Sequence, residues 1–161
     1  MKPIIYTRGQ QLPAILEQRI AILDGAMGTM IQRFKLGEAQ YRGERFKDFG
    51  RDVKGNNELL SLTRPDVIRD IHEGYLAAGA DIVETNTFGG TRIVLAEYDL
   101  VDKVREINVT AARLAREACA RFETPDWPRF VAGSMGPGTK TISVTGGVTF
   151  GQVRSAYAEQ T

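Results

Sequence analysis

Three short groups of polar residues, each flanked by glycine, are the parts of this sequence that could do chemistry. The first is Asp24-Gly25, which directly follows the apolar run Ile20–Leu23. The Asp24 carboxylate could hold an ammonium group, and Gly25 would let a ligand approach backbone N–H groups closely. An Asx turn that only ends a strand explains the same two residues equally well. Both interpretations therefore stand for this group.

The second group is Glu84-Thr-Asn-Thr87, which ends an apolar stretch that begins at Ala80. Side chains alternate along a strand, so Glu84 and Asn86 should point to one side and the two threonines to the other. The end of a strand does not by itself require four consecutive polar residues. The group predicts a ligand contact, made by Asn86 in particular, while Glu84 could instead accept hydrogen bonds from neighbouring backbone amides.

The third group, Gly133–Gly138, is followed by Thr139 and Lys140 and is similar to a phosphate-binding loop only in part. A nucleotide P-loop needs the lysine directly after its last glycine, and a helix directly after that. Thr139 separates the two residues here, and no helix is predicted to follow at once. The better interpretation is a turn that shapes the rim of a pocket, with Gly136 and Gly138 in it.

Two other reactive side chains are predicted to be structural. His72 has no second histidine or carboxylate at ligand spacing, so we expect it on a helix surface and not at a metal. Cys119, the only cysteine, lies near the apolar stripe of a helix and is expected to be a small buried hydrophobe. A single cysteine excludes an intrachain disulfide and a cysteine-built metal cluster.

The elements that must position the three groups alternate between strand and helix. Strands are predicted at residues 20–23, 80–88 and 129–134, and the first of them, which is apolar without alternation, should be buried on both faces. Strands joined by helices require right-handed crossovers and a parallel sheet. All three polar groups then fall at carboxyl ends of strands, where barrels and open α/β sheets carry their chemistry.

Between these strands, the spacing of apolar residues predicts helices and one long excursion. The excursion covers residues 31–62, and its many charges should form a solvated face. The helices are expected over about 11–19, 64–78 and 91–122, with a last one from about residue 149.

The composition is that of a globular domain with no strong charge. The chain has 161 residues, 42% of them hydrophobic, and 21 basic against 20 acidic side chains. The net charge of +1 predicts neither nucleic acid nor an anionic membrane as a partner. No apolar run reaches the roughly 18 residues of a membrane span, and no signal-peptide core is visible, so a reducing, cytoplasmic location is expected.

The motifs Leu23–Thr29, Glu84–Phe88 and Gly133–Gly138, together with the helix Ile107–Ala118, occur in order along the chain. This ordered set resembles the N-terminal homocysteine-binding domain of cobalamin-dependent methionine synthase, within the homocysteine S-methyltransferase family. The resemblance implies an α/β fold of the (β/α)8 TIM-barrel type. A complete barrel of this type takes about 250 residues, so residues 1–161 are predicted to be one partial domain that holds the first three βα units.

The resemblance also implies a reaction and a set of site residues. Family members transfer a methyl group to the sulfur of homocysteine, which a zinc ion on three cysteine thiolates binds. In the methionine synthase branch, which residues 31–62 resemble most, the donor is methylcobalamin, and cobalamin- and folate-binding modules are the partners. The residues carried over to the substrate pocket are Asp24, Gly25, Glu84, Asn86, Gly136 and Gly138.

The sequence departs from the family in one important respect. The zinc-binding cysteines of the family lie on later strands, two of them in a Gly-Gly-Cys-Cys-Gly motif, and this chain has no such motif. The chain is therefore predicted to be a fragment that is inactive alone, with no catalytic or metal-binding residue of its own. Two alternatives stay open: a non-catalytic partial barrel that needs a complementing chain, and another α/β enzyme that uses Asp24 and Asn86 around a phosphate or sugar.

Overall fold

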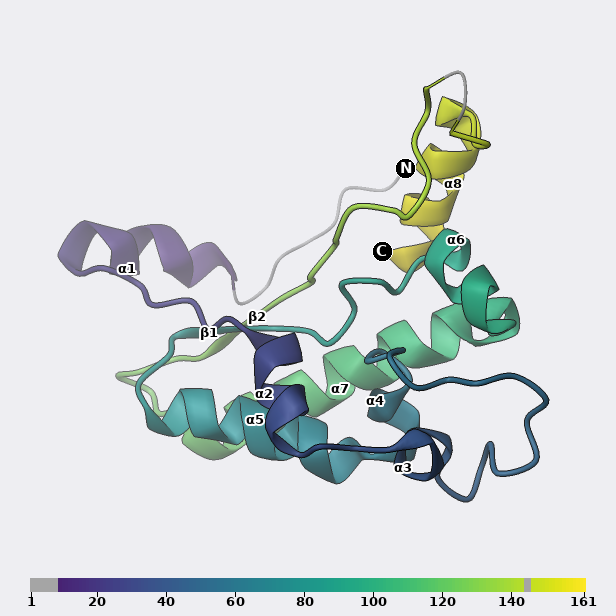
Figure 1. Cartoon of the computed structure of the whole chain (residues 1–161). Coiled ribbons are helices and arrows are strands. Elements are labelled where there is room, and N and C mark those ends of the chain that lie inside the picture. Colours follow the sequence, from purple (N-terminus) through teal and green to yellow (C-terminus); the bar gives the residue numbers. More distant parts are fainter. Residues whose placement is uncertain (1–8, 144–145) are drawn as a thin grey trace.

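The computed structural model describes residues 9–143 and 146–161, and it has an α/β fold around a small parallel sheet. Strands β1 (Ile82–Glu84) and β2 (Phe130–Ala132) pair in parallel, with Val83 opposite Val131. Helices α5 (Pro65–Ala77) and α7 (Val104–Phe122) lie side by side beneath these strands (Figure 1). The predicted partial domain also included residues 1–8 and 144–145, which lie outside the described residues.

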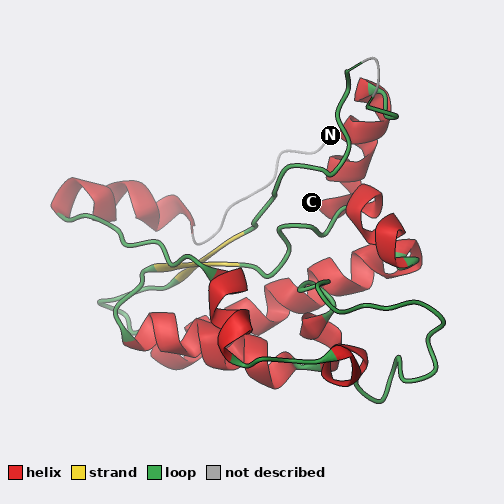
Figure 2. Ribbon diagram, viewed as in Figure 1, coloured by secondary structure: helices red, strands yellow, loops and turns green. Residues whose placement is uncertain are grey.

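The first predicted strand, residues 20–23, is present only as a single bridge. Leu23 pairs in parallel with Ile82, which places this segment beside β1 on the side away from β2. Ile20 is 86% exposed and Ile22 is 55% exposed. The prediction of a strand buried on both faces is therefore wrong, because the described part of the chain leaves most of these side chains uncovered. Figure 2 shows how short the extended elements are beside the helices.

Two aspartates hold this poorly packed segment against the sheet. Asp81, at the start of β1, accepts hydrogen bonds from both terminal nitrogens of Arg19 (2.8 and 2.7 Å) and from the Ile22 N–H. The indole N–H of Trp127 donates to the same carboxylate at 2.7 Å. The Arg19 guanidinium and these donors lower the pKa of Asp81 to about 2. Asp24 makes the second attachment, at the carboxyl end of the segment.

The helices differ from the predicted ones in extent. Helix α5 begins at Pro65, one residue after the predicted start at 64, and proline fits this first turn because its missing N–H does no harm there. The predicted helix over 91–122 is broken, because Asp99 adopts a left-handed conformation with φ of 57°. Short elements therefore precede α7: α6 (Arg92–Leu95), η2 (Ala96–Tyr98) and η3 (Val101–Lys103).

The ends of the described chain carry two further helices. Helix α1 (Leu12–Gln18), preceded by the turn η1 (Gly9–Gln11), has no buried residue and projects from one end of the molecule (Figure 1). Helix α8 (Phe150–Gln160) begins with a capping box between Thr149 and Gln152. No helix in the described ranges is long and apolar enough to cross a membrane.

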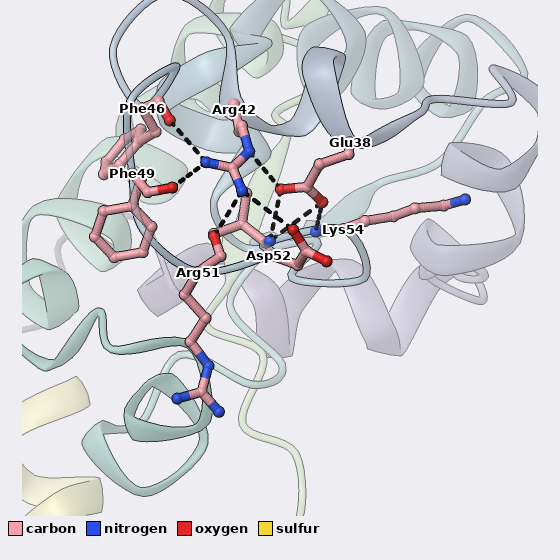
Figure 3. Close-up of polar contacts among 8 residues, drawn as sticks. Glu38, Arg42, Phe46, Phe49, Arg51, Asp52 and Lys54 are labelled. Atoms are coloured by element: carbon pink, nitrogen blue, oxygen red, sulfur yellow. Dashed lines mark hydrogen bonds and ion pairs between the residues drawn. The ribbon is translucent and has the colours of Figure 1, made fainter.

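The charged stretch 31–62 is folded back on the helices and is not only a solvated face. It begins in the last turn of α2 (Met27–Arg33), contains α3 (Glu38–Arg42) and ends in α4 (Leu60–Thr63). Arg42 pairs with Glu38 at 2.7 Å, and its guanidinium also donates to the backbone carbonyls of Phe46, Phe49 and Arg51 (Figure 3).

The Glu38 carboxylate closes this network from the other side. It accepts the N–H groups of Val53 and Lys54, at 2.9 and 2.7 Å (Figure 3). These bonds turn the chain so that residues 56–58 are brought back toward the sheet.

The helical core is closed. Leu60, Ile68 and Ile107 are all 0% exposed and join α4, α5 and α7. A second cluster, formed by Val83, Ala115 and Cys119 among others, joins α7 to the sheet. Burial of apolar area on this scale is what stabilises a small α/β domain.

The prediction for His72 is wrong in one respect. We expected it on the surface of its helix, and it is 0% exposed, with both ring nitrogens lacking a hydrogen-bond partner within the described structure. Burial lowers its pKa to about 4, so the imidazole is neutral at physiological pH.

Candidate functional site

A cavity of about 290 Å³ opens at the carboxyl ends of the sheet. Four separate segments form it: the loop after the first-strand segment, the turn at residues 57–58, the end of β1 and the end of β2. Its lining consists of Asp24, Gly25, Ala26, Met27, Gly28, Asn57, Glu58, Glu84, Thr85, Asn86, Phe88 and Ser134. Four of the six sequence-derived site residues are in this lining, and Gly136 and Gly138 are not.

Asp24 lies where the first-strand segment meets β1. Its Oδ1 accepts the backbone N–H of Glu84 at 2.8 Å, and its own N–H donates to the carbonyl of Ile82 at 2.9 Å. Partial burial raises the pKa of Asp24 to about 6, although the Glu84 N–H bond opposes the shift. Asp24 therefore fastens the segment to the sheet and also presents a carboxylate to the cavity.

The loop after Asp24 carries local backbone strain. Ala26 adopts a left-handed conformation with φ of 52°, which is unfavourable for a residue with a Cβ and costs about 1 kcal/mol. Strain of this kind collects at functional sites. A Cβ on Gly25 would meet nothing within 4 Å, so no described atom requires glycine there.

Asn86 is buried, and its amide is already engaged. Its Nδ2 donates to the carbonyl of Asn57 at 2.7 Å and to the hydroxyl of Ser61 at 3.2 Å. Asn86 therefore lines the cavity and also anchors the turn that forms the opposite wall. The Glu84 carboxylate accepts the hydroxyl of Ser134 at 3.1 Å, which joins β1 to the end of β2.

The two threonines of the second group stabilise the sheet edge. Their hydroxyl oxygens lie 2.6 Å apart, and Thr85 Oγ1 accepts the Ser134 N–H at 3.0 Å. Thr87 donates to the Ser134 carbonyl at 2.8 Å. These bonds continue the pairing of β1 and β2 past the last ladder residue.

Gly136 shapes the cavity from behind Phe88. Its N–H donates to the Phe88 carbonyl at 2.8 Å, and a Cβ at this position would lie 2.5 Å from the Phe88 ring. The Tyr157 hydroxyl donates to the Gly136 carbonyl at 2.6 Å, which fixes the loop on α8. Gly138 is different, because a Cβ there would come no closer than 3.8 Å to any atom outside its neighbours.

Sequence reasoning missed Glu58, Asn57, Phe88 and Ser134 as members of the lining. Glu58 accepts the Gly89 N–H at 2.7 Å, and burial raises the pKa of its carboxyl group. No sequence signal separates Glu58 from other acidic residues that precede apolar pairs, such as Asp66 before Val67 and Ile68.

The described residues do not fit a metal ion such as zinc. They include no group of three or more His, Cys, Asp or Glu side chains that could hold one. Cys119 is fully buried, as predicted, and its thiol donates to the Phe130 carbonyl at 3.6 Å. Burial raises its pKa to about 11, so the group is a thiol at neutral pH and is not an activated nucleophile.

Comparison with known proteins defines the class of this fold and site. The sequence profile of the homocysteine S-methyltransferases matches residues 21–161. The chain therefore belongs to the homocysteine S-methyltransferase family.

Two solved structures agree with this assignment. The oxidized form of the homocysteine methyltransferase MmuM from Escherichia coli is 27% identical, with a TM-score of 0.60. Its metallated form is 26% identical, with a TM-score of 0.59. Each match covers 78% of this chain but only about 40% of MmuM. The open two-stranded sheet thus corresponds to part of a TIM-barrel homocysteine methyltransferase.

Proposed function

We propose that this chain forms the pocket for the amino-acid part of homocysteine in a homocysteine S-methyltransferase. The observation that carries the proposal is the single cavity that Asp24, Gly25, Glu84 and Asn86 share. No lysine or arginine is among its described lining residues, so the cavity favours a ligand that brings a positive charge. The α-ammonium group of homocysteine fits that requirement.

The chain's own residues would bind and orient the substrate. The Asp24 carboxylate accepts hydrogen bonds from the ammonium group with the oxygen that does not hold the Glu84 N–H. Phe88, 58% exposed with its ring against Gly136, forms a wall that reduces access of water to the bound ligand. Gly136 contributes by leaving room for that ring. Gly138, at the outer rim, has no contact that argues for a direct role.

The sulfur-activating group belongs to residues outside this chain. A zinc ion would keep the homocysteine sulfur in its thiolate form, but the described residues offer no set of ligands for it. We therefore place its three cysteine ligands beyond Thr161. Methyl transfer is accordingly a proposal for the complete protein, because the match covers only about 40% of the MmuM chain.

We further propose the cobalamin-dependent methionine synthase branch, with methylcobalamin as donor and cobalamin- and folate-binding modules as partners. Its support is the resemblance of the long segment 31–62 to that branch, and Asn57 and Glu58 of this segment line the cavity. A cytoplasmic location remains a prediction that rests on the sequence, with its lone, buried Cys119.

Ligand titration tests the proposed pocket. In the complete gene product, Asp24→Asn should weaken binding of L-homocysteine about tenfold or more, because it removes the charge that faces the ammonium group. Asp48→Asn, at an exposed position outside the cavity, is the matched control and should leave the affinity unchanged. Equal affinities of the Asp24→Asn variant and the unmodified protein would contradict the proposal.

A second candidate is a non-catalytic partial barrel that acts only with a complementing chain. The exposed side chains of Ile20, Ile22 and Leu23 favour it, since they form an apolar strand edge that nothing described covers. Methyl transfer to homocysteine by the complete gene product would exclude this candidate.

A further inference from the structure

Glu58 comes from a different part of the fold than the other carboxylates of the cavity. It lies within the 31–62 excursion, in the turn before α4, and neither strand end contributes it. Its neighbours hold this turn in place. Asn56 Oδ1 accepts the Leu59 N–H at 3.1 Å, and Asn57 Oδ1 accepts the Tyr41 hydroxyl at 2.8 Å. The turn therefore presents Glu58 from a rigid base, a requirement for a binding residue.

The Glu58 carboxylate accepts backbone N–H groups, and no described cation pairs with it. Its Oε1 accepts the backbone N–H of Gly89 at 2.7 Å, and no side chain in the described ranges donates to it. No Lys or Arg forms an ion pair with it there, whereas Glu38, Glu73, Glu106 and Glu159 all have an arginine partner. Burial raises the pKa of Glu58, as expected for a carboxylate that lacks a cation.

Asp24 and Glu84 share this pattern. Each uses one carboxylate oxygen for a bond within the protein, Asp24 with the Glu84 N–H and Glu84 with the Ser134 hydroxyl. Three separate segments thus direct acidic groups at one cavity whose described lining has no basic side chain. Unpaired carboxylates are unfavourable when partly buried, and a ligand cation would relieve this.

We propose that Glu58 binds the α-ammonium group of the substrate together with Asp24, and so makes the pocket selective for an α-amino acid thiol over a thiol without the amino group. The proposal rests on the proposed function and names one further binding residue within it. An ammonium group has three N–H donors, more than one carboxylate oxygen can accept. Carboxylates on opposite walls, Asp24 on the loop and Glu58 on the turn, would together accept them.

The Gly89 bond provides a way to separate charge from position. A glutamine at position 58 keeps an oxygen that can accept the Gly89 N–H, but it has no negative charge. Glu58→Gln therefore preserves the attachment of the segment that carries Phe88 and removes only the electrostatic contribution. Glu44→Gln is the matched control, because the Glu44 side chain is 96% exposed and does not line the cavity.

The experiment is calorimetric titration of the complete gene product with two ligands, L-homocysteine and 4-mercaptobutanoate, which lacks only the amino group. The unmodified protein should prefer homocysteine. Glu58→Gln should weaken homocysteine binding about tenfold or more, the effect of one charge-assisted hydrogen bond. Its affinity for 4-mercaptobutanoate should stay within about twofold, and Glu44→Gln should change neither value.

The outcomes separate this inference from the proposed function. If the unmodified protein binds neither ligand, the proposed function fails. If it binds homocysteine and Glu58→Gln keeps the full preference, the inference is overturned and the function stands. Equal weakening of both ligands would show that Glu58 only positions the wall, which also overturns the inference. Should the variant fail to fold, absence of any preference in the unmodified protein is sufficient to overturn it.

Discussion

The helical layer and the first-strand segment of this molecule are held together by different forces. In the helical layer, Leu60, Ile68 and Ile107 are completely buried by residues of this same chain. In the first-strand segment, Ile20, Ile22 and Leu23 are between 49% and 86% exposed. Hydrogen bonds to Asp81 and Asp24 attach that segment in place of apolar packing. The helical core is thus buried by residues of this chain, while the side chains of the first-strand segment are largely exposed.

The largest expected effect is on the free energy of unfolding, when an isoleucine in each region is replaced by alanine. Ile107→Ala should lower the free energy of unfolding by about 2–5 kcal/mol, because it leaves a cavity in a closed core. Ile20→Ala should change it by less than about 0.5 kcal/mol, because the side chain is 86% exposed. Urea unfolding of the 161-residue chain measures both. Similar losses for the two variants would mean that the strand segment is covered after all.

A smaller effect should appear in the pH dependence of stability. The pKa of Asp24 is raised from 3.8 to about 6 in the folded protein. Its contribution to stability is therefore complete below about pH 4 and is lost as the pH rises through 6. Asp24→Asn should remove this decline and stabilise the chain at pH 7 by about 1 kcal/mol, after allowance for solvent screening.

The measurement is thermal or urea unfolding of both proteins at pH 4 and pH 7. The difference in stability between them should be close to zero at pH 4 and should appear by pH 7. A variant that is less stable than the unmodified protein at pH 7 would show that the bond to the Glu84 N–H needs the charge. Increased stability together with weaker homocysteine binding would be the usual exchange of stability for function at a binding site.

The smallest effect concerns the two glycines of the third polar group. Gly136→Ala should force the Phe88 ring to move, but the ring is 58% exposed and can turn outward, so less than about 1 kcal/mol of stability should be lost. Gly138→Ala, where the nearest atom is 3.8 Å away, should be neutral within about 0.5 kcal/mol. Only the first variant should alter homocysteine affinity in a titration. Equal effects would contradict the role assigned to Phe88.

Much of the fold could be predicted because its signals are local. The start of α5 at Pro65 and the burial of Cys119 follow from short stretches of sequence. The break at Asp99 could not be predicted from apolar spacing, which continues across it. The burial of His72 was missed because a single polar residue on an apolar helix face does not reveal what packs over it.

By itself, the sequence determined the order of the elements, the parallel sheet and the position of the polar groups at its carboxyl edge, because helical spacing, turns and chain direction are local or topological properties. Only the tertiary structure decided that Asp24 bonds to a residue 60 positions away and that Glu58 joins it at the same cavity. These contacts depend on how the 31–62 segment folds back, and long-range packing of that kind has no periodic signal in the sequence.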